Sequence, residues 1–154
     1  MEQQLVVFEL AEEIYGIDIA HVESIIKVPK ITPMPQSEHY VEGVINLRGE
    51  VVPVLDLRTS MDMPKVERTL NSRIVVVLLD EKRVGMIVDA VTEVTTITED
   101  KVQEMATLGG SAHAGMVTGI AKIEEHLIIC LDPSKMLHGA VGMVEVEKGL
   151  LDGF

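Results

Sequence analysis

The sequence is poor in aromatic residues and in cysteine, and each shortage excludes a class of structure or function. Its 154 residues include no Trp, two Phe and two Tyr, so the core must be built mainly from Val, Ile, Leu and Met. The chain also lacks the stacking side chains with which proteins usually bind single-stranded nucleic acid. Cys130 is the single cysteine, which excludes a disulfide within the chain and is typical of a reducing compartment.

Positive charge is scarce as well. The 13 Lys and Arg residues stand against 25 Asp and Glu residues, which gives a formal net charge of −12 at pH 7. Nucleic acids and anionic membrane surfaces attract clustered cations, so neither is an expected partner. No apolar run approaches the roughly 20 residues of a membrane span, and the N-terminus lacks the features of a secretory signal. We therefore expect a cytoplasmic protein that does not insert into a membrane.

What the sequence has in abundance is aliphatic residues, and they make up half of residues 41–58, VEGVINLRGEVVPVLDLR. This stretch predicts two strands joined by a tight hairpin. A type I turn from Asn46 to Gly49 would leave Leu47 and Arg48 at its tip. A cationic side chain on a hairpin tip favours a docking surface over a catalytic cleft.

The returning strand of this hairpin, Val51–Leu55, is apolar on both faces instead of alternating. Such a strand is usually covered on both sides. Pro53 cannot donate a ladder hydrogen bond, which predicts that the strand lies at a sheet edge or carries a bulge.

The first part of the chain predicts strands over 5–10 and 14–19, followed by a short helix. The helix would begin at Asp18 as its N-cap, because Ile19, Val22 and Ile25 follow with helical spacing. Pro29 would end it.

Two segments of the chain repeat later in the sequence. Shifting residues 5–19 by 69 positions aligns Leu5 with Ile74 and Gly16 with Gly85, and shifting residues 43–56 by 76 positions aligns Asp56 with Asp132. Strand propensity alone makes Val- and Ile-rich hairpins look alike, but two gapless matches in the same order favour a structural duplication. We expect one domain over residues 1–154, made of two similar small β units with a boundary near 59–72.

The two repeated hairpins differ at their tips. Arg48 and Gly49 in the first correspond to Glu124 and Glu125 in the second. The difference in charge permits the two units to face different partners.

No arrangement of residues indicates an enzyme or a metal site. The five histidines lack zinc-ligand spacing, and Cys130 lies in an apolar run, where it is expected to be a core residue. The glycines between Gly109 and Gly115 lack a phosphate-loop pattern. We therefore predict no catalytic residue, no metal and no cofactor. A small-molecule-binding barrel that uses this Gly-rich loop and a homo-oligomer assembled through sheet edges remain alternatives.

The aliphatic residues exceed what two small β units can bury against each other, and exposed aliphatic patches usually mark partner sites. The motifs in which these residues occur resemble the CheW family, the coupling proteins of bacterial chemotaxis. The similar segments are residues 41–58, VGMIVDAV at 84–91, LIICLDPSKML at 127–137 and EEIYGIDIAHVESII at 12–26. The resemblance extends from Leu5 to about Leu137.

The resemblance implies an all-β fold of two five-stranded β-barrel subdomains packed on a shared apolar core, with a few short helices and a first strand that can cross between barrels. It also implies a function, which is non-enzymatic coupling of transmembrane chemoreceptors to the histidine kinase CheA within a two-component system. The partners would be the cytoplasmic tip of the receptor and the regulatory domain of CheA, with the protein held at membrane-associated arrays by these partners. A CheW-like scaffold of a non-chemotactic pathway is the alternative.

The resemblance also assigns site residues by position. The receptor-binding groove would involve Val22, Ser24 and Ile25 on the predicted first helix, together with Gly43 and Arg48. Kinase binding is expected from aliphatic residues of the second unit, for which Ile74 and Val76 are chosen. The absence of an appended receiver or kinase segment favours a stand-alone adaptor.

Overall fold

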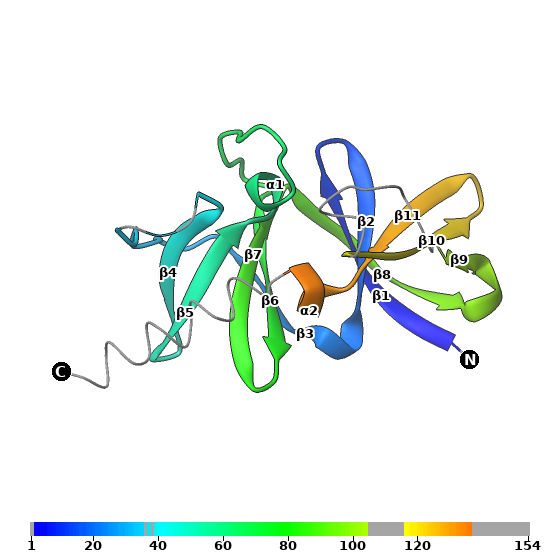
Figure 1. The fold of residues 1–154 in the computed structure, drawn as a ribbon, viewed down its shortest axis with the longest axis horizontal. Coiled ribbons are helices and arrows are strands. Elements are labelled where there is room, and N and C mark those ends of the chain that lie inside the picture. The colour runs from blue at the N-terminus through cyan, green and yellow to red at the C-terminus, as the bar shows by residue number, and fades with distance from the viewer. Residues whose placement is uncertain (1, 36, 38, 105–115, 137–154) are drawn as a thin grey trace.

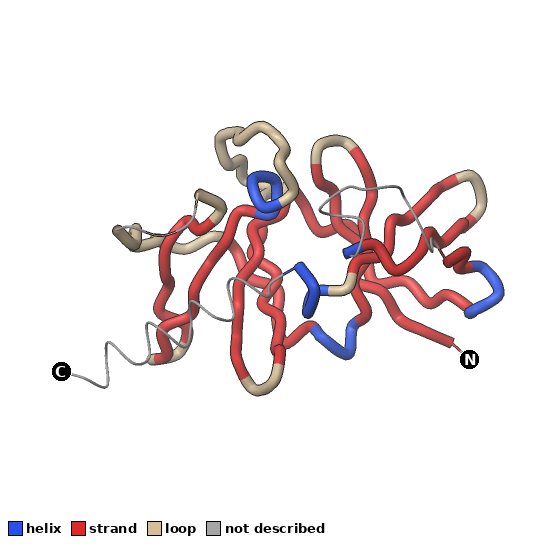
Figure 2. The backbone as a smooth tube through the Cα atoms, viewed as in Figure 1, coloured by secondary structure: helices blue, strands red, loops and turns tan. Residues whose placement is uncertain are grey.

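The computed structural model describes residues 2–35, 37, 39–104 and 116–136, and these form two β-sheets that lie side by side (Figure 1). Strands make up most of the described chain, and its helices are single turns (Figure 2). The helical turns are η1 (Ile19–His21), α1 (Leu57–Ser60), η2 (Glu99–Lys101) and α2 (Pro133–Met136). None of the helices in the described part of the chain has the length and apolar character needed to cross a membrane.

Sheet A has six strands and sheet B has five, in orders that do not follow the sequence. The order in sheet A is β8 (Ala90–Thr98), β1 (Glu2–Leu10), β2 (Glu13–Asp18), β11 (His126–Leu131), β10 (Val117–Ile123) and β9 (Val102–Glu104). The order in sheet B is β3 (Val22–Lys27), β6 (Arg73–Leu79), β7 (Lys82–Val88), β5 (Glu50–Asp56) and β4 (Val41–Leu47). Within the described residues no ladder joins the outermost strands of either sheet, so the expected barrels are open sheets.

Each sheet takes strands from both halves of the chain. In sheet A the early hairpin β1–β2 joins the late hairpin β10–β11, through a parallel ladder in which Gly16 lies opposite Cys130. In sheet B the hairpin β6–β7 joins β4–β5 in the same way, with Gly85 opposite Val54. The chain passes from sheet A to sheet B between β2 and β3, and it returns between β7 and β8. The two halves are therefore interleaved.

The repeat predicted from the sequence corresponds to this arrangement. The 69-residue shift places β1–β2 on β6–β7, and the 76-residue shift places β4–β5 on β10–β11. Gly16 and Gly85 occupy the same position in the two sheets. A Cβ at Gly16 would lie 2.9 Å from Ile128 Cγ2, and one at Gly85 would lie 2.8 Å from Ile74 Cγ2. Both positions therefore bring a neighbouring strand's side chain against the glycine backbone.

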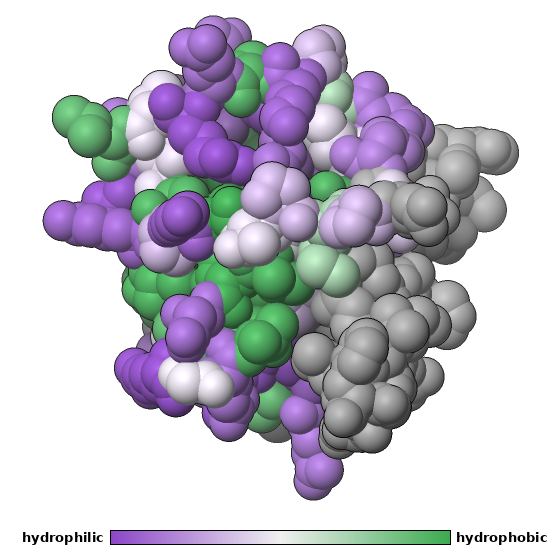
Figure 3. Space-filling view, turned by 90° about the vertical axis from the view of Figure 1, so that its left-hand side faces the viewer, coloured by the Kyte–Doolittle hydropathy of each residue, from purple (hydrophilic) through white to green (hydrophobic). Residues whose placement is uncertain are grey.

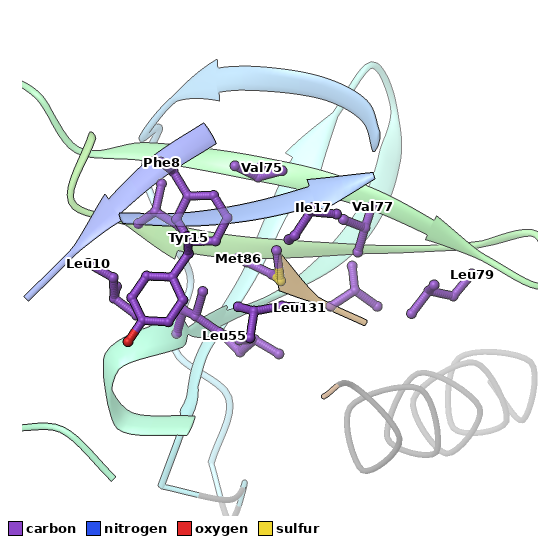
Figure 4. Packing of buried hydrophobic residues seen from close by; sticks show 13 residues of the cluster. Phe8, Leu10, Tyr15, Ile17, Leu55, Val75, Val77, Leu79, Met86 and Leu131 are labelled. Carbon is purple, nitrogen blue, oxygen red and sulfur yellow. The ribbon is translucent and has the colours of Figure 1, made fainter. Parts of the chain in front are cut away.

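Side-chain alternation divides the aliphatic residues into three cores. On β6, Val75 and Val77 face sheet A, whereas Ile74 and Val76 face the opposite side of sheet B. The interface core lies between the sheets (Figure 4) and contains Phe8, Leu10, Tyr15, Ile17, Leu55, Leu57, Val75, Val77, Leu79, Val84, Met86, Val88 and Leu131. The core of sheet A contains Leu5, Val7, Ile97, Ala121, Ile128 and Cys130. The core of sheet B contains Ile45, Val52, Val54, Ile74, Val76 and Ile87.

The predicted first helix is wrong beyond its first turn. Residues 19–21 form η1, capped by the Asp18 carboxylate, which accepts a hydrogen bond from the Ala20 N–H at 2.9 Å. Val22 to Lys27 then form strand β3. A register shift between Val22 and Ser24 lets Val22 lie opposite Val77 and Ile25 opposite Val75, on one face of the sheet. A bulged strand therefore produces the spacing of three that was interpreted as helical.

Two details of the central hairpin also differ from the prediction. Leu47 pairs with Glu50, and Arg48 (φ 53°) and Gly49 (φ 87°) form the two-residue turn between them. Two positive φ angles are typical of a type I′ turn, which matches the twist of the flanking strands, so Leu47 is not at the tip. Strand β5 is internal instead of an edge strand. Pro53 is tolerated there because the ladder to β7 involves only the next three residues, Val54–Asp56.

The contact at Gly85 leads to a prediction about stability. We expect Gly85→Ala to lower the free energy of unfolding by about 1–3 kcal/mol, because the new methyl group overpacks against two stiff β-branched side chains. These are Ile74 and Val54, whose Cγ2 atoms would lie 2.8 and 3.3 Å away. Urea unfolding measures the change. The control Val51→Ala, at a side chain that is 56% exposed, should change it by less than about 0.5 kcal/mol. Equal effects of the two substitutions would contradict the packing described.

Candidate docking surface

The residues assigned to receptor binding lie on β3 and on the β4–β5 hairpin of sheet B. Val22 is half-buried and packs against the interface core, Ser24 is half-buried, and Ile25 is 39% exposed. Arg48 is exposed at the hairpin tip. The strand β3 is an outermost strand of sheet B, so Ile25 projects from an edge with an unpaired side. Edges of this kind are where additional chains bind.

Gly43 has a structural role that the sequence does not indicate. It is buried, its φ is +145°, and a Cβ built on it would lie 2.1 Å from the carbonyl oxygen of Thr32. Thr32 and Val44 exchange two backbone hydrogen bonds of 2.9 Å. Gly43 therefore allows the connector between β3 and β4 to approach the β4 edge, and it has no side chain to offer a partner.

An ion-pair cluster links β3 to the hairpin. The guanidinium of Arg83, at the start of β7, donates from Nε to Oε2 of Glu23 on β3 at 2.6 Å, and it also donates to the carboxylate of Glu50. Glu50 directly follows the hairpin tip. One arginine therefore links the edge strand to the residue beside the hairpin tip. Sequence reasoning missed Arg83, because strand periodicity does not reveal which strands become neighbours.

The residues chosen for kinase binding are not on the surface. Ile74 and Val76 both have 0% exposure and belong to the core of sheet B. A partner could reach them only if that core opened. Both alternate with Val75 and Val77, which face the interface core, so residues 74–77 of β6 are buried on both faces. We therefore do not place the kinase surface on Ile74 and Val76.

The structure adds a second edge that is equivalent to β3. Strand β8 is an outermost strand of sheet A, and the same 69-residue shift that relates β1 to β6 places Val22 on Val91 and Ile25 on Val94. Like Val22, Val91 is partly buried against the interface core. Val94 is 50% exposed. The sequence contained this signal, since the shift continues without a gap beyond the segment in which it was noticed.

The pairing confirms the equivalence of the two edge strands. Val94 lies opposite Val6 on β1, as Ile25 lies opposite Val75 on β6, and both ladders contain a register shift at the corresponding place. Glu93 takes the position of Ser24 and Thr92 that of Glu23, so the two edges share aliphatic residues but carry their glutamates at different positions.

A second ion pair joins the sheets. The guanidinium of Arg58, on α1, donates from Nε to Oδ1 of Asp89 at 2.9 Å and from its terminal amine to Oδ2 at 2.6 Å. Asp89 Oδ2 also accepts from the Ala11 N–H in the β1–β2 turn at 2.9 Å. Since α1 follows β5 of sheet B and Ala11 belongs to sheet A, Asp89 ties the two sheets together beside the interface core.

Two aspartates near this junction have pKa values shifted in opposite directions from the usual value of an aspartate. Burial by itself would raise the pKa of Asp89, but the hydrogen bonds from Arg58 and from the Ala11 N–H outweigh it, so the pKa is lowered. Burial raises the pKa of Asp56, and the nearby Glu42 raises it further, despite its hydrogen bond from the Arg58 N–H. Asp56 caps α1 through that bond.

Three observations on the described residues bear on catalysis. They contain no group of three or more His, Cys, Asp or Glu side chains that could hold a metal ion. Burial raises the pKa of the Cys130 thiol, which disfavours the thiolate needed for nucleophilic attack. The hollow beside it is open and is lined mainly by polar residues, including Gln3, Asp18, His21, Thr118 and Asp132. The loop between Gly109 and Gly115 lies outside the described residues.

Comparison with known proteins shows the family of this chain. Residues 4–141 match the model of the CheW-like domain. The chain belongs to the CheW family. It is 35% identical to the chemotaxis protein CheW of Thermotoga maritima over 88% of each chain. It is 32% identical to CheW of Treponema pallidum over 86% of this chain and 81% of that protein.

A solved structure supports the same family at the level of the fold. The scaffolding protein CheW from Thermoanaerobacter tengcongensis is similar with a TM-score of 0.77 and 39% sequence identity, over 86% of this chain and 90% of that one. The resemblance seen in the sequence motifs is thereby confirmed. This member of the CheW family has the two-subdomain β fold that the resemblance implied, with open sheets in place of closed barrels.

Breaking the ion pair between Arg58 and Asp89 should destabilise the folded protein. We expect Arg58→Ala to lower the free energy of unfolding by about 1–3 kcal/mol, because a partly buried carboxylate loses its charged donors. Urea unfolding at neutral pH measures this. The control Arg73→Ala removes an arginine that donates hydrogen bonds to the backbone carbonyls of Leu70 and Ser72, and it should cost less stability. A smaller effect of Arg58→Ala than of the control would contradict the role of the pair.

The lowered pKa of Asp89 also predicts that the free energy of unfolding depends on pH. Its pKa in the folded protein is lowered, so its stabilisation is fully present above the unfolded value of about 3.9 and is lost as pH falls through the folded value. We expect Asp89→Asn to be less stable than the parent at pH 7, with the difference shrinking below about pH 4. Urea unfolding of both proteins across this range measures the difference. A difference that stays constant with pH would show that the charge of Asp89 is not responsible.

Proposed function

We propose that this chain is a non-enzymatic adaptor that couples the cytoplasmic tip of a transmembrane chemoreceptor to the regulatory domain of the histidine kinase CheA. It would act in the cytoplasm, held at receptor arrays by these partners. The names of its CheW relatives support a role in chemotaxis. The observation that carries the proposal is an edge strand with an exposed isoleucine, fixed by Arg83 beside a hairpin that presents an exposed arginine.

The first contact would be between β3 and a helical receptor tip. Ile25 offers an exposed aliphatic side chain and Val22 a partly exposed one on the same face of an edge strand, which suits the apolar stripe of an amphipathic helix. Arg48 would pair with a receptor carboxylate. An exposed pair of this kind contributes only about 0.2–1 kcal/mol, so Arg48 would orient the helix more than it would hold it.

We propose that the equivalent strand β8 of sheet A is a second binding surface of the same kind as β3. Val91 and Val94 present the same aliphatic pattern as Val22 and Ile25, and Glu93 replaces the neutral Ser24. A helix bound on β8 would therefore carry a cation near Glu93, whereas one bound on β3 would carry an anion near Arg48.

The kinase contact is proposed for the β10–β11 hairpin instead of the buried β6. Leu127 on β11 is 56% exposed and belongs to the second repeated unit, where aliphatic kinase contacts are expected. The adjacent turn contains Glu124 and Glu125, whose charge differs in sign from that of Arg48 on the other hairpin. This placement separates the kinase contact from the receptor contact. It is therefore compatible with both partners binding at once.

The alternatives gain no specific support. A scaffold of a non-chemotactic two-component pathway would use the same surfaces, and binding assays with CheA would separate it from the proposal. A small-molecule-binding barrel would be supported by an enclosed cavity, whereas the hollow beside Cys130 is open.

Receptor binding should depend on Arg48. We expect Arg48→Glu to weaken binding of a receptor-tip fragment by about tenfold or more, because like-charge contact costs more than the loss of a pair. Calorimetric titration with the receptor fragment and, separately, with the CheA regulatory domain measures both affinities. The affinity for CheA should remain unchanged. Equal loss of both, with an unchanged circular dichroism spectrum, would contradict separate surfaces.

The aliphatic part of the surface can be tested at Ile25. We expect Ile25→Asp to abolish detectable binding of the receptor fragment, because it places a charge in the centre of the apolar contact. Val66→Asp is a matched control, since Val66 is similarly exposed (45% against 39%) but lies outside the proposed surface. If Val66→Asp weakens receptor binding as strongly as Ile25→Asp does, β3 is not the receptor surface.

A further inference from the structure

Two cationic side chains lie directly opposite each other at one end of the edge strand β3. Lys27, the last residue of β3, pairs with Arg73, the first residue of β6. Directly opposed residues of an antiparallel pair project from the same face of the sheet, and like charges in this arrangement are destabilising. Among the described residues, neither side chain forms an ion pair with a carboxylate. No ion pair in this part of the chain therefore offsets the repulsion.

The internal repeat shows that the fold does not require this cationic pair. The 69-residue shift places Gln4 on Arg73 and Lys27 on Thr96, and Gln4 lies opposite Thr96 in the ladder between β1 and β8. Two neutral side chains therefore occupy the same position in sheet A. A local arrangement that lowers stability, and that the duplicated unit lacks, is typical of a binding site, because proteins break such local rules mainly where function needs it.

Arg73 also holds the turn that precedes β6. Its Nη1 donates to the carbonyl oxygens of Leu70 and Ser72 at 2.9 and 2.8 Å. In the same turn, the Thr69 N–H donates to Ser72 Oγ at 2.9 Å. Leu70 extends from this turn with 97% exposure. The structure therefore presents an aliphatic side chain beside the cationic pair.

The cationic pair lies at the end of sheet B that is opposite to the β4–β5 and β6–β7 turns. The segment between α1 and β6 lies at the same end, at the top of Figure 1. In Figure 3 this upper end of the molecule is mainly hydrophilic, and hydrophobic residues are gathered below it. Lys65 and Arg68 of this segment both pair with the carboxylate of Glu42, at 2.7 and 2.6 Å. The carboxylate of Glu42 is therefore already held by two other cations.

Lys27 lies on the same face of β3 as Ile25, the exposed isoleucine of the proposed receptor surface. Ile25 pairs with Val75 and Lys27 with Arg73, so the two β3 residues are two positions apart on one side of the sheet. Two strand residues span about 6.6 Å, and four helix residues rise by about 6 Å. A helix that follows β3 with an aliphatic residue on Ile25 therefore brings the side chain four residues further to the cationic pair.

We propose that Lys27 and Arg73 bind a carboxylate of the receptor-tip helix, which belongs to an Asp or Glu four residues from the aliphatic side chain that covers Ile25. This inference rests on the proposed function, and it adds the charge that the helix must carry at that position. A carboxylate between the two cations replaces their repulsion with two charge-assisted contacts. The exposed Leu70 adds an aliphatic contact beside them.

Lys27→Glu tests this site, because it should move stability and affinity in opposite directions. It places a carboxylate opposite Arg73, so the free energy of unfolding measured with urea should rise. The affinity for a receptor-tip fragment, measured by calorimetry, should fall about tenfold or more, because a like charge now faces the helix carboxylate. Lys122→Glu is the matched control. Lys122 is also exposed on a strand, but it pairs with the uncharged Leu127, and its substitution should leave the affinity for the receptor fragment unchanged.

A second variant keeps the test decisive if Lys27→Glu disturbs the fold. Lys27→Met removes one charge without adding another, and it should still weaken receptor binding severalfold. Affinity equal to that of the parent in Lys27→Met, while Ile25→Asp abolishes binding, would overturn the carboxylate site and leave the proposed function standing. If the parent protein itself does not bind the receptor fragment, the proposed function fails, and the carboxylate site fails with it.

Discussion

The structure depends on burying both faces of the strands β1 and β6. In each strand, alternate side chains face the core of its own sheet, and the remaining ones meet in the interface core between the sheets. Phe8 and Tyr15 stack there with ring centroids 6.0 Å apart, and the rest of that core is almost entirely aliphatic. The exposed aliphatic side chains of the described strands belong instead to edge strands or lie near hairpin turns, and they are Ile25, Val51, Leu78, Val94 and Leu127.

The path of the chain also ties the two sheets together. Because the chain crosses between the sheets after β2 and again after β7, sheet A is built from two separate parts of the chain, and sheet B is the continuous part between them. The pair between Arg58 and Asp89 adds a polar tie at the second crossing, where Asp89 also accepts from the backbone of Ala11. The first crossing has no equivalent pair, since the 69-residue shift places Ala20 on Asp89. The two repeated units are therefore similar in backbone structure but differ in their charged residues.

Much of the fold could be predicted from the sequence, because strand periodicity and the internal repeat are local signals. The hairpins, the duplication and the aliphatic core follow from the order of residues alone. Residues 22–27 were misassigned because a bulge makes a strand imitate the spacing of a helix. Ile74 and Val76 were misplaced for a different reason. A continuous aliphatic run shows that a strand is buried on both sides, but it does not show whether a partner or the protein itself covers each side.

The proposed function requires that two different partners bind this protein at the same time. Sedimentation velocity of the protein with a receptor-tip fragment and the CheA regulatory domain can detect such a complex. We expect a ternary complex, and we expect the receptor fragment to bind with the same affinity whether or not saturating CheA domain is present. Mutually exclusive binding, with each partner displacing the other, would contradict it.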